Sequence, residues 1–191
     1  MNRFLNAVLF MLYAVLNTAN AADIKTSKFY DVYKSEVAGY SGKAVITKIN
    51  QFINSFPYKD DVFTYNTENH WASPSEYIKN KGGDCEDSAM MKALLLKKQG
   101  VKTVYVRFNK RNTNHVALVA IAENRLWLLD DKKPYVITKQ LAKKLKLQFF
   151  KVKGHHLKEK IFSHIPTIAL VGGKPTSLSG NSVQIATAMD Y

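Results

Sequence analysis

Cysteine is nearly absent from this sequence, which contains Cys85 and no other in 191 residues. A lone cysteine cannot form an internal disulfide, so a disulfide framework is excluded. The hydrophobic content of 46% is enough for one compact domain with its own core. An isolated cysteine is commonly a small buried hydrophobic residue, so a chemical role for Cys85 needs support from its surroundings.

The sequence also lacks an apolar run long enough to cross a membrane. The apolar run at 4–16 is shorter than the roughly 20 residues that a spanning helix requires, and no later stretch is apolar enough. It follows the basic Arg3 and precedes a small-x-small cleavage pattern at 19–21. These features predict a secretory signal peptide over residues 1–21, with an uncleaved membrane anchor as the alternative. We therefore expect an exported protein that is not an integral membrane protein after signal cleavage.

Acidic residues are scarce, since 15 aspartates and glutamates stand against 28 lysines and arginines, for a net charge of +13. A basic surface favours anionic partners. No RNA-binding or DNA-binding motif accompanies the charge, so a nucleic-acid partner is not expected. An acidic protein, an anionic glycan or a membrane surface fits better, and a merely solvated basic surface is the alternative.

The surroundings of Cys85 support a chemical role. In "KGGDCEDSAMMKALLLKK", two glycines precede Asp84, a good helix N-cap, and helix-forming residues continue until Gly100. Cys85 is therefore expected in the first turn of a helix. The positive end of the helix dipole and the unpaired N–H groups would stabilise a thiolate there and could serve as oxyanion donors. This placement is typical of a nucleophile.

Three carboxylates, on Asp84, Glu86 and Asp87, flank the thiol. One interpretation is helix capping, because acidic groups are favourable in a first helical turn. The same charges, however, raise the pKa of a neighbouring thiol and so oppose the thiolate. A calcium ion would resolve this conflict, because it takes oxygen ligands and its charge offsets theirs. We therefore predict a calcium site on these three residues.

A cysteine nucleophile needs a base, and His115 is the candidate among five histidines. It opens "HVALVAIA", an apolar run typical of a central strand. The segment 115–131 has two apolar runs joined by a short turn and predicts an antiparallel hairpin that returns toward its start. An even number of turn residues places Asp130 on the face of His115, whereas an odd number places Asp131 there. A surface turn carrying two acids is the alternative.

The stretch 46–137 resembles the bacterial transglutaminase-like cysteine proteinases, the family of LapG-type periplasmic proteases. The likeness rests on W-x-x-P-x-E (Trp71, Pro74 and Glu76), on G-D-C-E-D at 83–87, and on the histidine and aspartate that follow in order. Each motif alone is weak, whereas the combination is specific.

The resemblance implies an α+β fold with a papain-like, transglutaminase-like core, in which the nucleophile-bearing helix packs on an antiparallel sheet. It implies Cys85 as the nucleophile, His115 as the base and Asp130 as the acid that orients the histidine. One departure concerns Asp131, since asparagine often follows the catalytic aspartate in the family. The choice between Asp130 and Asp131 therefore stays open.

The resemblance also implies calcium near the cysteine, on Asp84 and Glu86 with Asp87 as a further candidate ligand. The resulting expectation is a periplasmic, calcium-dependent cysteine endopeptidase that cleaves a cell-surface protein such as an adhesin. An inner-membrane receptor is expected to regulate it. A transglutaminase or amidase with the same acyl-enzyme, or an inactive basic binding module for acidic polymers, is the alternative. We expect the catalytic domain over 22–165 and a flexible tail over 166–191, where glycine, serine and proline are frequent.

Overall fold

A computed structural model describes residues 26–152 and 162–165 of the chain. The predicted signal peptide over 1–21 and the predicted tail over 166–191 lie outside the described residues. In the described part, no helix has both the length and the apolar character needed to span a bilayer.

Helices come first along the described chain and strands dominate its second half. The helices are 26–37, α2 (Gly42–Asn54), α3 (Asp61–Tyr65), α4 (Pro74–Asn80), α5 (Cys85–Lys98) and α6 (Lys139–Leu145). The strands are β1 (Lys102–Lys110), β2 (Thr113–Ala122), β3 (Arg125–Leu129), β4 (Tyr135–Val136), β5 (Gln148–Val152) and β6 (Phe162–Ile165).

The strands form one sheet in the order β4-β3-β2-β1-β5-β6, and every neighbouring pair is antiparallel. The central strand β2 does not alternate between buried and exposed residues, because most of its length is buried, as its apolar sequence predicts. Glu123 and Asn124 connect β2 to β3, and both have positive φ angles, 54° and 56°. Such a two-residue turn matches the twist of a β-hairpin and sets its register.

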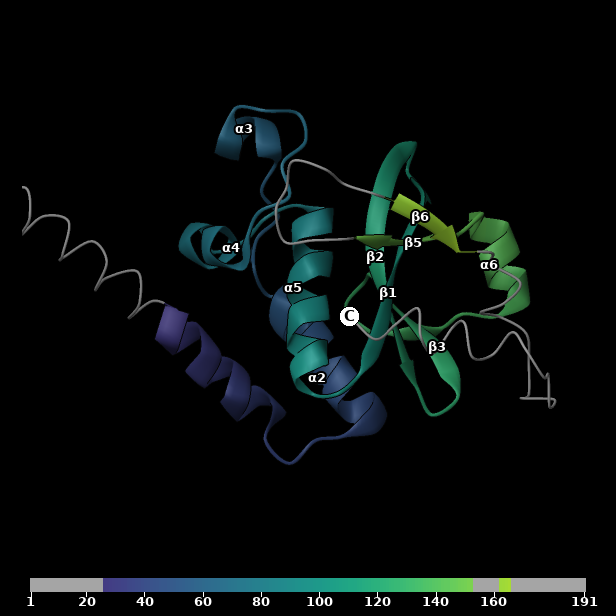
Figure 1. The fold of residues 1–191 in the computed structure, drawn as a ribbon, viewed down its shortest axis with the longest axis horizontal. Coiled ribbons are helices and arrows are strands. Elements are labelled where there is room, and N and C mark those ends of the chain that lie inside the picture. The colour runs from purple at the N-terminus through teal and green to yellow at the C-terminus, as the bar shows by residue number, and fades with distance from the viewer. Residues whose placement is uncertain (1–25, 153–161, 166–191) are drawn as a thin grey trace, which may run out of the picture.

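Helices cover both faces of this sheet. Figure 1 shows α5 and α2 against one face, with α3 and α4 beyond α5, and α6 on the opposite face. The first face has a large core that joins Ile49 of α2, Leu95 of α5 and Leu118 of β2. The second has a smaller core that includes Val119, Phe149 and Ala142 of α6. The predicted α+β class, with a helix carrying the cysteine on an antiparallel sheet, is confirmed.

Candidate active site

Helix α5 begins at Cys85, and the preceding turn has room for glycine alone. Asp84 is the N-cap, and its side chain accepts a hydrogen bond from the backbone N–H of Asp87 at 3.3 Å. A Cβ atom on Gly83 would lie 2.6 Å from the Cβ of Asp87, and one on Gly82 would collide with the carbonyl oxygen of Pro57. The glycine pair thus lets the chain turn tightly into α5 and places the thiol in its first turn.

The thiol of Cys85 is half-buried and donates a hydrogen bond to Oε2 of Glu86 at 3.0 Å. Burial raises the pKa of the thiol, the charge of Glu86 raises it further, and a hydrogen bond from the backbone of Val116 opposes the rise. Because Val116 directly follows His115, this contact also brings the thiol to the start of β2, where the predicted base lies.

His115 and Asp130 form a hydrogen-bonded pair. Nε2 of the histidine lies 2.5 Å from Oδ1 of the aspartate. The hairpin register explains the pairing: Leu118 faces Leu129, so the residue after β3 falls next to the start of β2 on the face that His115 shares. The sequence left the length of the turn open, and the structure has the even-numbered turn that favours Asp130 over Asp131.

Lys110, at the end of β1, neutralises the acidic side of this pair. Its Nζ lies 2.5 Å from Oδ2 of Asp130 and 3.0 Å from Oδ1 of Asp131. Burial works against ionisation of Asp130, but the hydrogen bonds from His115 and Lys110 hold its pKa below the ordinary value. The side chain of Asp130 is 6% exposed, whereas that of Asp131 is 65% exposed. We call Lys110, His115 and Asp130 the base region.

Four carboxylates gather at the other side of the thiol, and we call them the acid cluster: Asp61, Asp84, Glu86 and Asp87. All four residues are buried. Ligand atoms of Asp61, Asp84 and Asp87 lie within 4.8 Å of one another, and those of Asp84, Cys85 and Glu86 do so as well. The ion pairs of the described residues do not include these carboxylates.

The electrostatics of the acid cluster fit a divalent cation. Burial, followed by the charges of Glu86 and Asp87, raises the pKa of Asp84 to about 9. Burial, with the charges of Asp61 and Glu86, raises the pKa of Asp87 to about 6. Oδ1 of Asp61 and Oδ2 of Asp87 are buried and have no hydrogen-bond partner among the described residues. Unpaired, buried carboxylate oxygens at this spacing are suitable ligands for calcium.

Asp61 is the member of the acid cluster that sequence reasoning missed. It begins α3, far from Asp84 along the chain, and two contacts bring the segments together: a β-bridge between Tyr58 and Gly83, and a hydrogen bond from the N–H of Lys59 to the carbonyl of Gly83. The acidic pair at 60–61 was visible in the sequence, but no periodicity linked it to the cysteine.

The W-x-x-P-x-E motif lies at the start of α4 and in the loop before it, beside the acid cluster. Glu76 forms a capping box with Ser73 at the start of α4 and lies 3.4 Å from Nε2 of His70. Trp71 is 3% exposed and packs against Tyr105. Between these motif residues, the N–H of Ala72 donates to Oδ1 of Asp87 at 2.6 Å. The motif therefore supports the acid cluster from the loop before α4.

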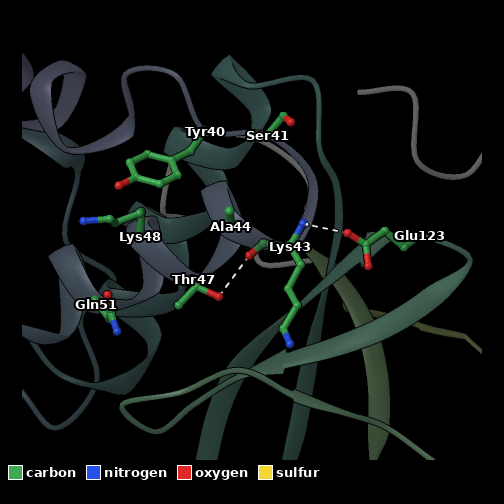
Figure 2. A pocket seen from close by; sticks show the side chains of 8 residues that line it. All are labelled: Tyr40, Ser41, Lys43, Ala44, Thr47, Lys48, Gln51 and Glu123. Atoms are coloured by element: carbon green, nitrogen blue, oxygen red, sulfur yellow. Dashed lines mark hydrogen bonds between the residues drawn. The ribbon is translucent and has the colours of Figure 1, made fainter.

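A pocket lies at the other end of the β2–β3 hairpin, beside the N-terminal half of α2 (Figure 2). Tyr40, Thr47 and Lys48 line it together with Glu123 of the hairpin turn. Glu123 accepts a hydrogen bond from the backbone N–H of Lys43 at 3.1 Å and so attaches α2 to the hairpin. None of the predicted site residues lines this pocket.

Comparisons with known proteins identify the family and the fold. A family model described as a transglutaminase-like domain matches residues 27–154, more than half of the chain. The solved structure of Legionella pneumophila LapG has 25% sequence identity and a TM-score of 0.52, and the likeness covers 73% of this chain and 81% of that chain. EGTA-treated L. pneumophila LapG has 24% identity and a TM-score of 0.53, with 75% and 82% covered. Comparison with curated protein sequences gives no significant match. The chain therefore belongs to the transglutaminase-like family and has the fold of a LapG-like cysteine protease.

Proposed function

We propose that the protein is a cysteine endopeptidase in which Cys85, His115 and Asp130 act as a triad. The observation that carries the proposal is the hydrogen-bonded pair of His115 and Asp130 at the start of β2, directly beside the helix N-terminus that carries the only cysteine of the chain. Similarity to LapG supports a peptidase rather than another use of the same fold.

Each residue of the proposed triad has a separate role in acyl transfer. His115 directs Nε2 to Asp130, so Nδ1 is the ring nitrogen that accepts the thiol proton. The sulfur of Cys85 then attacks the peptide carbonyl, and the N–H groups at the start of α5 stabilise the oxyanion. His115 returns the proton to the leaving amine, and water hydrolyses the thioester. Asp130 keeps the imidazole oriented and stabilises its positive charge.

Calcium is part of the proposal because the acid cluster offers a suitable set of ligands. Asp61, Asp84 and Asp87 would hold the ion, and Glu86 would join them from the side of the thiol. When bound, the ion supplies positive charge that offsets the repulsion among buried carboxylates. Burial and, without that charge, the carboxylates of Glu86 and Asp84 raise the pKa of Cys85, which disfavours the nucleophilic thiolate.

We further propose that the enzyme acts in the periplasm on a cell-surface protein such as an adhesin, under the control of an inner-membrane receptor. The signal-peptide pattern at 1–21 supports export, and the excess of lysine and arginine suits an acidic protein substrate. A transglutaminase or amidase would form the same acyl-enzyme and differ in whether an amine or water resolves it.

The decisive experiment incubates the mature protein and calcium with candidate cell-surface proteins and sequences new N-termini. We expect a defined cleavage site that disappears with Cys85→Ala. Incorporation of a labelled amine without new N-termini would favour a transglutaminase, and no Cys85-dependent product of either kind would favour the binding module.

A further inference from the structure

Lys92 is buried in α5 although the proposed chemistry does not use it. It lies two turns after Cys85 on the same helix and is 3% exposed. Its Nζ donates a hydrogen bond to the carbonyl oxygen of Leu129 at 3.0 Å. Leu129 is the last residue of β3 and directly precedes Asp130. The helix that carries the nucleophile thus also contacts the segment that carries the acid.

Two asparagines of α2 bind the next carbonyls of the same segment. Nδ2 of Asn50 donates to the carbonyl of Asp131 at 2.7 Å. Nδ2 of Asn54 donates to the same carbonyl at 2.9 Å and lies 3.4 Å from the carbonyl of Asp130. Asn50 is fully buried. Lys92 and the two asparagines therefore bind three consecutive carbonyls, and we call this set the carbonyl clamp.

The segment needs such support because strand pairing ends just before it. The β2–β3 register extends to Leu129 and its partner Leu118, so the ladder of β3 does not fix the backbone of Asp130. A hydrogen bond of 2.5 Å between His115 and Asp130 nevertheless demands an accurately placed carboxylate. The carbonyl clamp supplies this missing backbone restraint from helices α5 and α2, which carry its three side chains.

Stability alone does not account for the lysine. Burial lowers the pKa of Lys92 to about 8, with the charge of Lys110 acting in the same direction and those of Asp130 and Asp131 opposing it. A buried charge is costly, and an apolar side chain of similar length often stabilises a fold more. A buried lysine that binds the segment leading to Asp130 is therefore expected to serve function.

We propose that Asn50, Asn54 and Lys92 are positioning residues that hold Asp130 in register with His115 and so couple the nucleophile helix to the acid. This inference rests on the proposed function for its kinetic consequence, whereas its structural consequence, the orientation of His115, can be measured without any substrate.

The test compares Lys92→Met and Asn54→Leu with two controls on the same helices, Lys97→Met and Gln51→Leu, which alter exposed positions. We expect both clamp variants to lower kcat by about 10- to 100-fold, the usual range when a residue that orients a catalytic ligand is lost, with little change in KM. The controls should retain wild-type kinetics.

A second measurement follows the histidine directly. In ¹⁵N NMR spectra of the wild-type protein, assigned with His115→Gln, the ring should have its proton on Nε2 because that nitrogen faces a carboxylate. Both clamp variants should shift the ring toward a mixture of tautomers. They should also slow alkylation of Cys85 toward the rate of His115→Ala, and alkylation is site-specific because the chain has a single cysteine.

The outcomes separate this inference from the proposed function. If the wild-type protein cleaves nothing but the clamp variants change the tautomer, the clamp stands and the peptidase proposal fails. If Cys85-dependent cleavage occurs and folded Lys92→Met and Asn54→Leu keep the wild-type kcat and tautomer, the clamp is wrong. Should Lys92→Met not fold, Asn54→Leu decides alone, because Asn54 is only half-buried.

Discussion

The two sides of the candidate site differ in how their charges are balanced. In the base region, every charged group has a partner, since Asp130 lies between His115 and Lys110. In the acid cluster, four carboxylates are buried, Asp84 and Glu86 lie near the thiol, and two carboxylate oxygens have no hydrogen-bond partner among the described residues. The comparison teaches that the fold itself balances the charges of the base region, whereas the buried carboxylates of the acid cluster lack a counter-charge from the described residues, which is the basis of the calcium proposal.

The largest effect is expected from Cys85→Ala, which removes the nucleophile and leaves both charge patterns in place. Turnover should fall by at least about 10³-fold, because no other group can form the thioester. The melting temperature and calcium binding should remain near those of the wild-type protein, which circular dichroism and calorimetry can check. Undiminished proteolysis by this variant would contradict the assignment of the nucleophile.

Removal of calcium should disturb the acid cluster and leave the base region unchanged. Chelation with EGTA is expected to abolish activity reversibly and lower the melting temperature, because the acid cluster loses its counter-charge. Calcium should restore both better than magnesium, which prefers a stricter octahedral geometry.

Two variants sharpen this test. Asp61→Asn should weaken calcium binding in calorimetry, because it removes one charge from the acid cluster. Asp130→Asn should keep the calcium-dependent shift in melting temperature, because it alters only the base region. Full activity of the chelated protein would contradict the calcium site and favour helix capping as the role of the carboxylates.

The two aspartates after β3 should differ strongly. Asp130→Asn is expected to lower kcat by roughly 10²- to 10⁴-fold, because the amide cannot stabilise the imidazolium or enforce its tautomer. Asp131→Asn should have a much smaller effect, since its exposed carboxylate contacts Lys110 and not His115. Steady-state kinetics of both variants provide the comparison, and the reverse order of damage would assign the orienting role to Asp131.

Glycine variants test how the acid cluster is shaped. Gly83→Ala should destabilise the fold by about 1–3 kcal/mol, because its methyl group overlaps Asp87 in a packed site. Gly100→Ala is a suitable control: its φ of 69° strains any side chain, but nothing lies within 4 Å, so a cost near 1 kcal/mol is expected. Calcium affinity should fall for Gly83→Ala alone, and equal affinities in the two variants would contradict the tight packing at Gly83.

The smallest effect concerns acid stability of the base region. Hydrogen bonds hold the pKa of Asp130 below its ordinary value of 3.8 despite burial. The stability that this carboxylate contributes is therefore present above that value and lost as the pH falls through the lowered pKa. Urea unfolding should show that the difference in unfolding free energy between the wild-type protein and Asp130→Asn is largest near neutral pH and shrinks below about pH 4. A difference that stays constant with pH would show that the pair is not ionic.

Local rules were sufficient to place Cys85 at the start of a helix, whereas the fold class followed from the resemblance to a known family. Two glycines, an N-cap aspartate and a run of helix formers placed Cys85 at the start of a helix, and α5 begins there. Hairpin periodicity likewise brought His115 and an acid to one end of two strands. The roles of these residues in catalysis and of the acids in metal binding stay predictions, which the variants above test.

The sequence by itself determined features that depend on neighbouring residues: the cap and glycine turn before α5, the buried strand that contains His115, and the return of the chain toward it. The tertiary structure decided what depends on segments meeting from afar. It selected Asp130 through the turn at Glu123 and Asn124, added Asp61 to the acid cluster, and brought Lys92 to a carbonyl of the next layer. These contacts arise from packing helices on a sheet, and no spacing along one segment encodes which distant carboxylate or carbonyl such packing brings close.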